Sequence, residues 1–367
     1  MSKLRVGILF GGRSTEHDVS VTSATTVLQA MDPGRYTPVL IGIDHAGRWY
    51  VAEPELEFLP EAVLQSPEAV PSFATLREGL ELLRGRDLGP ALASPLDVIF
   101  PIIHGRLGED GSAQGLFEMA DVPYVGTDVR STALCMDKTL TKAVLRDAGL
   151  PVLPSHEGQI HTLLEDADPF LDAVESEFDY PVFVKPTNSG SSVGTQKARS
   201  RTQLHQGIKE AGRYDLDVMV EPAVEAREIE CAVLGGHTPQ ASALGEILFA
   251  NEFYDYEAKY VSDETSLAIP ADVSQEKSEE MREMAVRAFC ALKCWGMARV
   301  DFFLDRSSER VFINELNTHP GFTEGSMFPR LWEYSGIALP EQIDHLIELA
   351  LQRHRERKAL EVRFQLR

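Results

Sequence analysis

The chain has 367 residues, 43% of them hydrophobic and 25% charged, which is typical of a globular protein with two or three domains and argues against a disordered chain. Asp and Glu outnumber Lys and Arg by 57 to 35, so the formal charge is −22. This excess argues against nucleic acid or an anionic membrane as a partner, and a phosphate ligand must be held locally by lysines, backbone amides or a metal ion. Since no apolar stretch approaches the roughly 20 residues of a membrane span and no signal peptide is recognised, we expect a cytoplasmic protein.

The first third of the chain is predicted to alternate strands with helices. Its first strand ends in Gly11-Gly12, a turn that leads directly into a helix. The predicted strands are 4–10, 36–43 and 96–103, and the predicted helices are 16–30 and 112–120. We therefore expect a parallel sheet covered by helices, with residues 52–72, rich in Pro, Glu and Ala, as a surface insertion.

Further elements follow from about residue 131, and a domain boundary is expected just before it. The first is a helix that closes at Gly149 with Pro151 beyond, as helix ends commonly do. The predicted helices are 131–148, 202–211, one that runs through Cys294, and 339–360, and the predicted strands are 182–185, 217–220, 228–234 and 243–249. The four cysteines are interpreted as buried reduced thiols, because they are too few and too scattered for a disulfide framework.

Two strand-like segments near the C-terminal end, 298–304 and 311–317, carry polar groups at two-residue spacings. Side chains alternate along a strand, so Arg299 and Asp301 share one face, as do Glu315 and Asn317. A hairpin would bring the four together, and two carboxylates with an amide oxygen suit Mg²⁺. The same pattern fits a solvated hairpin face, and these segments alone do not decide between the two.

Residues 185–194 leave a strand and contain three serines and two glycines within six positions. Such a loop can place amides and hydroxyls over phosphates, and Lys185 at the strand end can reach phosphate oxygens. The loop lacks the Gly-Lys-Ser/Thr ending of a P-loop and the dinucleotide fingerprint. A plain flexible hairpin is the alternative.

Two further polar residues follow predicted strands. Glu16 begins a helix, where a carboxylate would repel phosphate but could hold an ammonium group, although acidic residues are also routine at helix starts. His104 lies at a carboxyl edge of the presumed sheet, where open α/β sheets bind ligands, but a lone histidine is more often satisfied by its neighbours.

Together these segments resemble the D-alanine:D-alanine ligases of the ATP-grasp superfamily, over nearly the whole chain and in the family's order. The matching segments are 11–20, 104–111, 136–138, 185–194, 254–260, 299–301 and 315–321. The resemblance implies an α/β fold, α+β in part, with an N-terminal parallel α/β domain (1–130), a central lid domain (131–221) and a C-terminal catalytic domain (222–367). It also implies an activity: ATP phosphorylates the carboxylate of one D-alanine, and the amine of a second attacks the D-alanyl phosphate. The dipeptide supplies peptidoglycan synthesis.

The resemblance implies roles for the residues around the substrates. Glu16 would bind the ammonium of the first D-alanine, with Val19 and His104 nearby. Ser191 and Tyr260 would join Glu16 in a hydrogen-bonded triad that closes the active-site loop. The remaining positions that the resemblance assigns here are Arg299 and the Gly321 amide for the oxyanion, and Ser326 for the carboxylate of the second substrate.

The resemblance also implies the nucleotide and metal contacts. Lys138 and Lys185 would hold ATP phosphates under a lid that contains Ser192, and Lys259 would reach the terminal phosphate. The adenine and ribose contacts would be Glu221, Val224 and Glu228, and the ligands of two Mg²⁺ or Mn²⁺ ions would be Asp301, Glu315 and Asn317. Pro222 stands where some relatives have lysine, and it has no amide hydrogen to offer adenine, which puts ATP affinity in question.

D-Alanine and ATP are the expected ligands, in a homodimer, with K⁺ as a candidate activating ion. A related ligase that takes D-lactate, D-serine or another amino acid as second substrate is the alternative; Tyr260 favours D-alanine over D-lactate. A nucleotide-binding regulator would lack a lysine or metal ligand, and none is missing. A dinucleotide-dependent oxidoreductase fails, because its fingerprint is absent.

Overall fold

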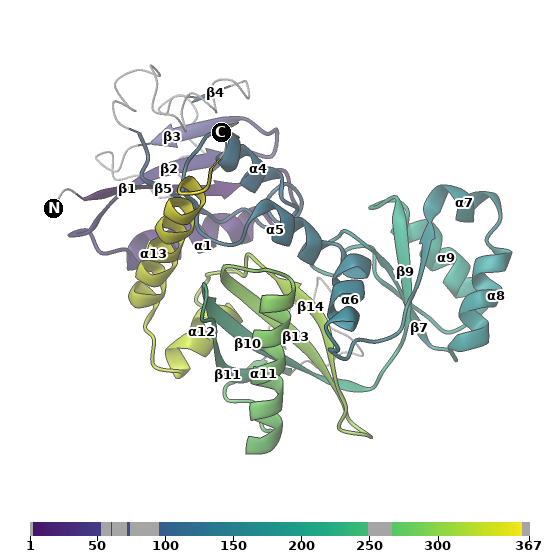
Figure 1. The fold of residues 1–367 in the computed structure, drawn as a ribbon. Coiled ribbons are helices and arrows are strands. Elements are labelled where there is room, and N and C mark those ends of the chain that lie inside the picture. The colour runs from purple at the N-terminus through teal and green to yellow at the C-terminus, as the bar shows by residue number, and fades with distance from the viewer. Residues whose placement is uncertain (1–2, 53–59, 61–71, 74–94, 249–265, 362–367) are drawn as a thin grey trace, which may run out of the picture.

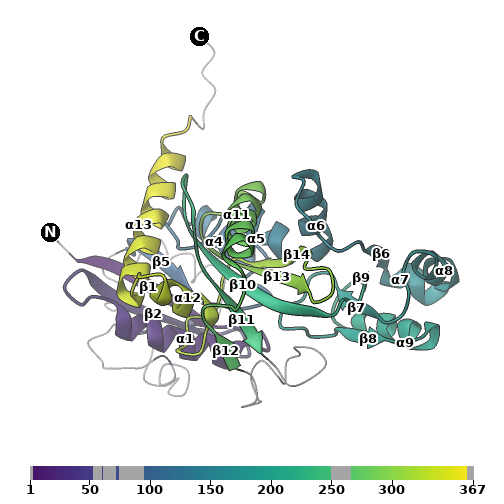
Figure 2. The same ribbon diagram turned by 90° about the horizontal axis from the view of Figure 1, so that it is seen from below.

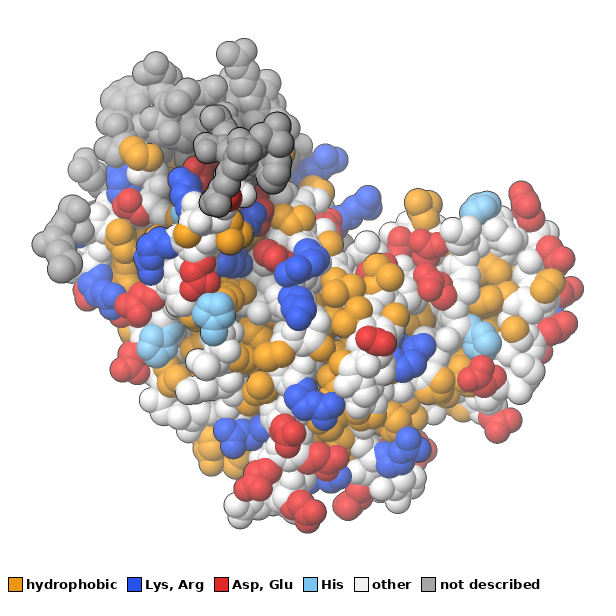
Figure 3. All heavy atoms as spheres, viewed as in Figure 1, with side chains coloured by type: hydrophobic (Ala, Val, Ile, Leu, Met, Phe, Trp, Pro, Cys, Tyr) orange, Lys and Arg blue, Asp and Glu red, His pale blue; other side chains and the backbone are white. Residues whose placement is uncertain are grey.

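The structure, a computed structural model, describes residues 3–52, 60, 72–73, 95–248 and 266–361. Figure 1 shows three lobes, each built around its own sheet. Acidic and basic side chains are interspersed over the face seen in Figure 3, so the net negative charge does not form a single field there. Within the described residues, no helix has both the length and the apolar character that crossing a membrane requires.

The N-terminal sheet has the order β4-β3-β2-β1-β5. Its strands are β1 (Leu4–Gly11), β2 (Tyr36–Ile43), β3 (Trp49–Ala52), β4 (Ser72–Phe73) and β5 (Val98–Pro101). The parallel pairing expected from the sequence holds for β2, β1 and β5, but β3 and β4 are antiparallel. The prediction of a parallel sheet is wrong at this edge because the short turn at Asp44 and Gly47 can only reverse the chain.

Helices cover both faces of this sheet, as its apolar strands require. Val6 and Ile8 of β1 pack with α1 (His17–Ala30), and Leu9 faces the other side with α4 (Ser112–Met119). The carboxyl ends of β1 and β5 therefore present Glu16 and His104 at one edge of the sheet.

The helix expected over 131–148 is two helices, α5 (Val129–Met136) and α6 (Lys138–Asp147). Asp137 separates them: its backbone is extended, and its carboxylate accepts hydrogen bonds from the amides of Thr139 and Leu140 at 2.9 and 3.0 Å. Because Asp is a favoured N-cap, it starts a new helix here and the prediction of one helix is wrong. Lys138 thereby becomes the first residue of α6.

The second lobe contains an antiparallel sheet with the order β6-β9-β7-β8. Its elements are β6 (His156–Gln159), α7 (Ile160–Glu165), α8 (Asp168–Glu177), β7 (Val182–Pro186), β8 (Gln196–Ala198), α9 (Arg201–Ala211) and β9 (Asp217–Pro222). Val184 and Val220 pack with the three helices, so the alternate residues Lys185 and Glu221 face the other side.

The third sheet is antiparallel, with the order β12-β11-β10-β13-β14. Its strands are β10 (Ala226–Gly235), β11 (Gln240–Leu248), β12 (Ser266–Ala268), β13 (Gly296–Asp305) and β14 (Val311–Asn317). One face packs on α11 (Gln275–Ala291), as seen in Figure 2. The helix expected to run through Cys294 ends three residues earlier, because Lys293 adopts a positive φ of 57°. Cys135, Cys231 and Cys294 are buried as expected, whereas Cys290 is exposed.

The chain ends with α12 (Met327–Tyr334) and α13 (Leu339–Lys358), the latter within two residues of its predicted end. Figure 1 shows α13 lying between the N-terminal sheet and the third sheet. Leu346 and Ile347 share one core with Phe100 of β5 and Met297 of β13. The last helix thus joins two lobes that are far apart in sequence.

Candidate active site

Two cavities of about 660 and 650 Å³ lie side by side where the three lobes meet. One extends between the second and third sheets, and the other extends toward α1 and β5. Their linings have six residues in common: Lys138, Ser189, Ser191, Glu230, Arg299 and Glu315. These residues form a shared wall, and we call the two spaces the sheet cavity and the helix cavity.

The predicted hairpin contributes Arg299 and Glu315 to this wall. In its register Arg299 pairs with Asn317 and Asp301 with Glu315, so the four polar groups converge as the spacing indicated. Asp301 lines the sheet cavity, Asn317 lines the helix cavity, and Glu315 lines both.

Arg299 is held in the wall by carboxylates. Its Nε and Nη2 donate to the two oxygens of Asp301, each at 2.7 Å, and Nε lies 3.1 Å from Glu230 Oε1. Burial alone would lower the pKa of Arg299, but Asp301 and Glu230 raise it well above its usual value. The guanidinium is therefore a permanent cation with a fixed direction.

Lys138, Lys185 and Lys197 line the sheet cavity, and Lys142 lies behind it. Lys138 Nζ donates to the carbonyl of Ser189 at 2.6 Å and lies 3.5 Å from Glu315 Oε2. Lys185 and Lys142 each bind one carboxylate oxygen of the buried Glu221. Burial would raise the pKa of Glu221, but these two ammonium groups hold it at about 2. The cavity thus has cations at fixed positions in an acidic chain.

The other predicted nucleotide residues line the sheet cavity too: Ser192, Glu221, Val224 and Glu228. Ser191 and Ser192 have positive φ values of 48° and 57°, a left-handed backbone that is uncommon outside glycine. The predicted glycine-serine loop therefore makes a tight turn over the shared wall. It does not lead into a phosphate-binding helix, in agreement with the sequence.

Glu16 and Ser191 meet at the helix cavity although 175 positions separate them. Ser191 Oγ donates to Glu16 Oε1 at 2.5 Å, which ties the glycine-serine loop to the start of α1. Val19, one turn along α1, lines the same cavity. The third proposed member of this triad, Tyr260, and the predicted phosphate contact Lys259 lie outside the described residues.

His104 is buried at the edge of the helix cavity. Its Nδ1 donates to the carbonyl of His319 at 3.0 Å and lies 3.5 Å from Glu109 Oε1, while its buried Nε2 has no hydrogen-bond partner among the described residues. Burial would lower the pKa of His104, but the hydrogen bond to Glu109 raises it. Burial and repulsion by His104 lower the pKa of His319 to about 3, so His319 is neutral at pH 7.

Gly321 and Ser326 close the far end of the helix cavity. Ser326 Oγ accepts from the Thr323 amide at 3.0 Å, and a Cβ at Gly321 would approach this Oγ to 2.8 Å. A side chain at position 321 would thus force the Ser326 hydroxyl to move.

Sequence reasoning missed three charged residues at the site: the buried Lys142 and Glu230 and the partly buried Glu109. Glu230 had a signal, because it follows Glu228 at the two-residue spacing used for the hairpin and pairs with Asp301 across the sheet. Lys142 lies one helical turn after Lys138, a spacing that places both on one face of α6.

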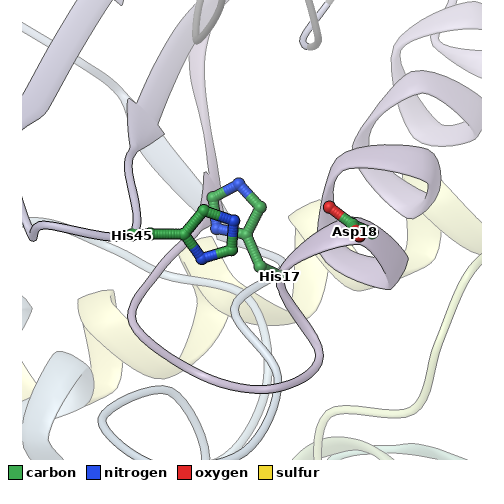
Figure 4. A group of neighbouring side chains, drawn as sticks. All are labelled: His17, Asp18 and His45. Atoms are coloured by element: carbon green, nitrogen blue, oxygen red, sulfur yellow. The ribbon is translucent and has the colours of Figure 1, made fainter.

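Another cluster near the site contains His17, Asp18 and His45, whose potential ligand atoms lie within 4.8 Å of one another. Figure 4 shows the two imidazole rings stacked, with centroids 3.8 Å apart, and Asp18 beside them at the start of α1. Stacking keeps the nitrogen lone pairs of the two rings in separate, nearly parallel planes, whereas the lone pairs of metal ligands converge on one point. The arrangement therefore indicates a ring contact rather than a formed metal centre.

Comparisons with known proteins agree with this geometry. Family models described as D-ala D-ala ligase N-terminus and C-terminus match residues 5–127 and 144–348. The chain is 47% identical to D-alanine--D-alanine ligase A of Chromobacterium violaceum, over 98% of each chain. It is 45% identical to the ligase A of Salmonella typhimurium, over 98% of this chain and 99% of the other.

Two solved structures extend the likeness to three dimensions. The D-alanine-D-alanine ligase of Coxiella burnetii has a TM-score of 0.82 at 37% identity, over 98% of this chain and 97% of that one. The VanG D-Ala:D-Ser ligase of Enterococcus faecalis has a TM-score of 0.83 at 32% identity, over 95% and 100%. The expected ATP-grasp fold class is confirmed. Shared domains, shared length and shared fold all lead to one assignment: the chain belongs to the D-alanine--D-alanine ligase family.

Proposed function

We propose that this chain joins two D-alanine molecules into D-alanyl-D-alanine at the expense of ATP, with ADP and phosphate as the other products. The observation that carries the proposal is the wall that the two cavities share. A nucleotide in the sheet cavity and an amino acid in the helix cavity would meet at Lys138, Arg299 and Glu315. Phosphoryl transfer requires mainly that the reactants are positioned and that the charge of the phosphates is neutralised.

In the sheet cavity, the nucleotide would lie with adenine toward Glu221 and Val224, ribose toward Glu228, and phosphates toward Lys138, Lys185 and Ser192. Pro222 has no amide hydrogen, so the adenine contacts fall to the Glu221 carbonyl and the Val224 amide. The carboxylate of the first D-alanine would attack the terminal phosphorus, and ADP would leave.

In the helix cavity, Glu16 would hold the ammonium of the first D-alanine, oriented by its 2.5 Å hydrogen bond from Ser191. Val19 and His104 would bound that substrate, and Ser326 would bind the carboxylate of the second. When the second amine attacks the D-alanyl phosphate, negative charge develops on the carbonyl oxygen. Arg299 and the Gly321 amide are proposed to stabilise that charge, after which phosphate leaves.

The residues of the hairpin fit a hard divalent cation, because Asp301, Glu315 and Asn317 offer only oxygen donors. They would hold Mg²⁺ or Mn²⁺, two ions by the family resemblance, and a bound divalent ion would neutralise phosphate charge during transfer. Arg299 is the cation that balances Asp301 in this structure. K⁺ is proposed as a further activating ion.

We also propose the division into an N-terminal domain (1–130), a lid domain (131–221) and a catalytic domain (222–367). An acylphosphate hydrolyses in water, so the lid would close over the reactants, with Lys259 and Tyr260 taking part as the family resemblance implies. A homodimer that works in the cytoplasm completes the proposal.

The test is an assay with ATP, Mg²⁺ and D-alanine, in which products are identified by mass spectrometry. D-Alanyl-D-alanine and ADP are expected in equal amounts, and omission of Mg²⁺ should abolish both. ADP without the dipeptide would contradict the substrate assignment.

A panel of second substrates should accompany that assay. D-Serine, D-lactate and L-alanine are each offered with D-alanine, and D-alanine is expected to be used most efficiently. A preference for D-serine would assign the chain to the activity that the name of the VanG protein describes.

A further inference from the structure

A buried lysine that the proposed mechanism does not use lies behind the sheet cavity. Lys142 of α6 is 2% exposed, and its Nζ binds Glu221 Oε2 and donates to the Leu153 carbonyl at 3.2 Å. Glu221 and Leu153 line the sheet cavity, whereas Lys142 is not among its lining residues. Lys142 can therefore act on a nucleotide only through its partners.

Glu221 is shared between two ammonium groups. Lys185 binds Oε1 and Lys142 binds Oε2, while the carboxylate is 1% exposed. Lys185 and Glu221 occupy diagonal positions on neighbouring strands, because Phe183 pairs with Glu221 and Lys185 lies two residues further along β7. The second ammonium, that of Lys142, comes from a different element, α6, and binds the other carboxylate oxygen of Glu221.

The charges are not balanced one to one. Two cations and one anion leave an excess positive charge in a buried place, which is costly unless an anion arrives. Of the two lysines, only Lys185 lines the sheet cavity, so it is the one that can turn toward a phosphate oxygen. After that movement, Lys142 and Glu221 remain as a neutral buried pair.

Without Lys142, the same movement would leave the Glu221 carboxylate buried and unpaired. Lys185 would then be retained by Glu221, since breaking a buried pair by removing one partner is strongly unfavourable.

We propose that Lys142 is a positioning residue for the nucleotide: it keeps the charge of Glu221 compensated, so that Lys185 is available to a phosphate of ATP. This inference rests on the proposed nucleotide role of the sheet cavity. Burial lowers the pKa of Lys142, whereas the nearby carboxylate of Glu221 raises it. This is expected for a lysine whose charge depends on this one partner.

The experiment compares the affinities of ADP and adenosine for Lys142→Met, measured by calorimetry with Mg²⁺ present. ADP affinity should fall at least about tenfold, while adenosine affinity should change less than about threefold, because only the phosphate contact depends on Lys185. Lys209→Met, which removes an exposed lysine from α9, is the matched control and should change neither. An equal loss for both ligands, or no loss for ADP, would show that Lys142 only supports the fold.

A double variant provides the second measurement and replaces the first if Lys142→Met fails to fold. Lys142→Met combined with Glu221→Gln removes the buried anion together with its cation, so its ADP affinity should lie within about threefold of that of Glu221→Gln alone. A larger additional loss contradicts the proposal. Both measurements are independent of dipeptide formation, so a wrong substrate assignment would not affect them.

Discussion

At the residue scale, the site depends on charged and polar groups whose partners come from both near and distant parts of the chain. Arg299 is fixed by Asp301 two residues away, a contact that strand alternation made predictable. The bond between Ser191 and Glu16 spans 175 positions, and no spacing rule reaches that far. Their pairing was implied by the family resemblance alone, because only the folded chain brings the two segments together.

Glu315 is the one predicted metal ligand whose side chain lines both cavities. Glu315→Gln keeps the shape of the side chain but removes its charge. Mutation of a residue that only supports a metal ligand typically costs roughly 10- to 100-fold, so we expect kcat to fall by more than that when a proposed ligand itself is changed. Steady-state kinetics over a range of Mg²⁺ concentrations would measure this, with unchanged circular dichroism as evidence of folding.

Glu309→Gln is the matched control, since Glu309 is exposed in the turn of the same hairpin. It should retain wild-type kinetics. If Glu315→Gln retained substantial activity, Glu315 would have to be removed from the metal site.

At the element scale, alternation and turn residues gave most strands, and the errors have physical causes. The antiparallel edge of the first sheet was missed because pairing direction depends on the length of a connection, and the sequence does not mark where β3 begins. The short elements β6, α7 and α8 were not predicted at all. Two of them have six residues or fewer, too short for a periodic pattern to stand out.

The break at Asp137 is an element-scale feature that makes Lys138, a proposed phosphate contact, the first residue of α6. Asp137→Ala should destabilise the protein by about 1 kcal/mol, as loss of an N-cap typically does, and should raise KM for ATP severalfold through a less well placed Lys138. Thermal unfolding and initial-rate kinetics measure the two effects.

Ser274→Ala tests whether the kinetic effect follows from lost stability alone. Ser274 caps α11 in the same way, by accepting a hydrogen bond from the Lys277 amide at 3.2 Å. It should lower stability comparably and leave KM for ATP unchanged. Equal KM values in the two variants would refute the role given to the α6 cap.

At the scale of the whole molecule, the last helix ties the first lobe to the third. Arg353 of α13 is buried, and it donates hydrogen bonds to the carbonyls of Gly126 and of Tyr124, the latter at 3.0 Å. Its Cζ lies 4.2 Å from the centroid of the Tyr124 ring. The sequence predicted only a final helix over residues 339–360. It gave no sign of this arginine's position, because burial of a charge depends on carbonyls from another lobe.

Arg353→Met should lower the free energy of unfolding by about 3 kcal/mol, because two buried carbonyls lose their donor. Urea unfolding followed by fluorescence would measure the change. Arg355→Met, at an exposed position on the same helix, should stay within about 0.5 kcal/mol of wild type. Matching transitions for the two variants would mean that α13 does not hold the lobes together through Arg353.

The wall between the cavities has a thermodynamic consequence. Because six residues face both spaces, a ligand on one side changes the charge and position of groups that the other side also contacts. With the nucleotide and the amino acid in the proposed cavities, we expect their affinities to be linked. Linkage is reciprocal: whatever factor ATP applies to the affinity for D-alanine, D-alanine must apply to the affinity for ATP. A mutation in the wall alters that common factor, so its effect cannot be assigned to either ligand by studying one alone.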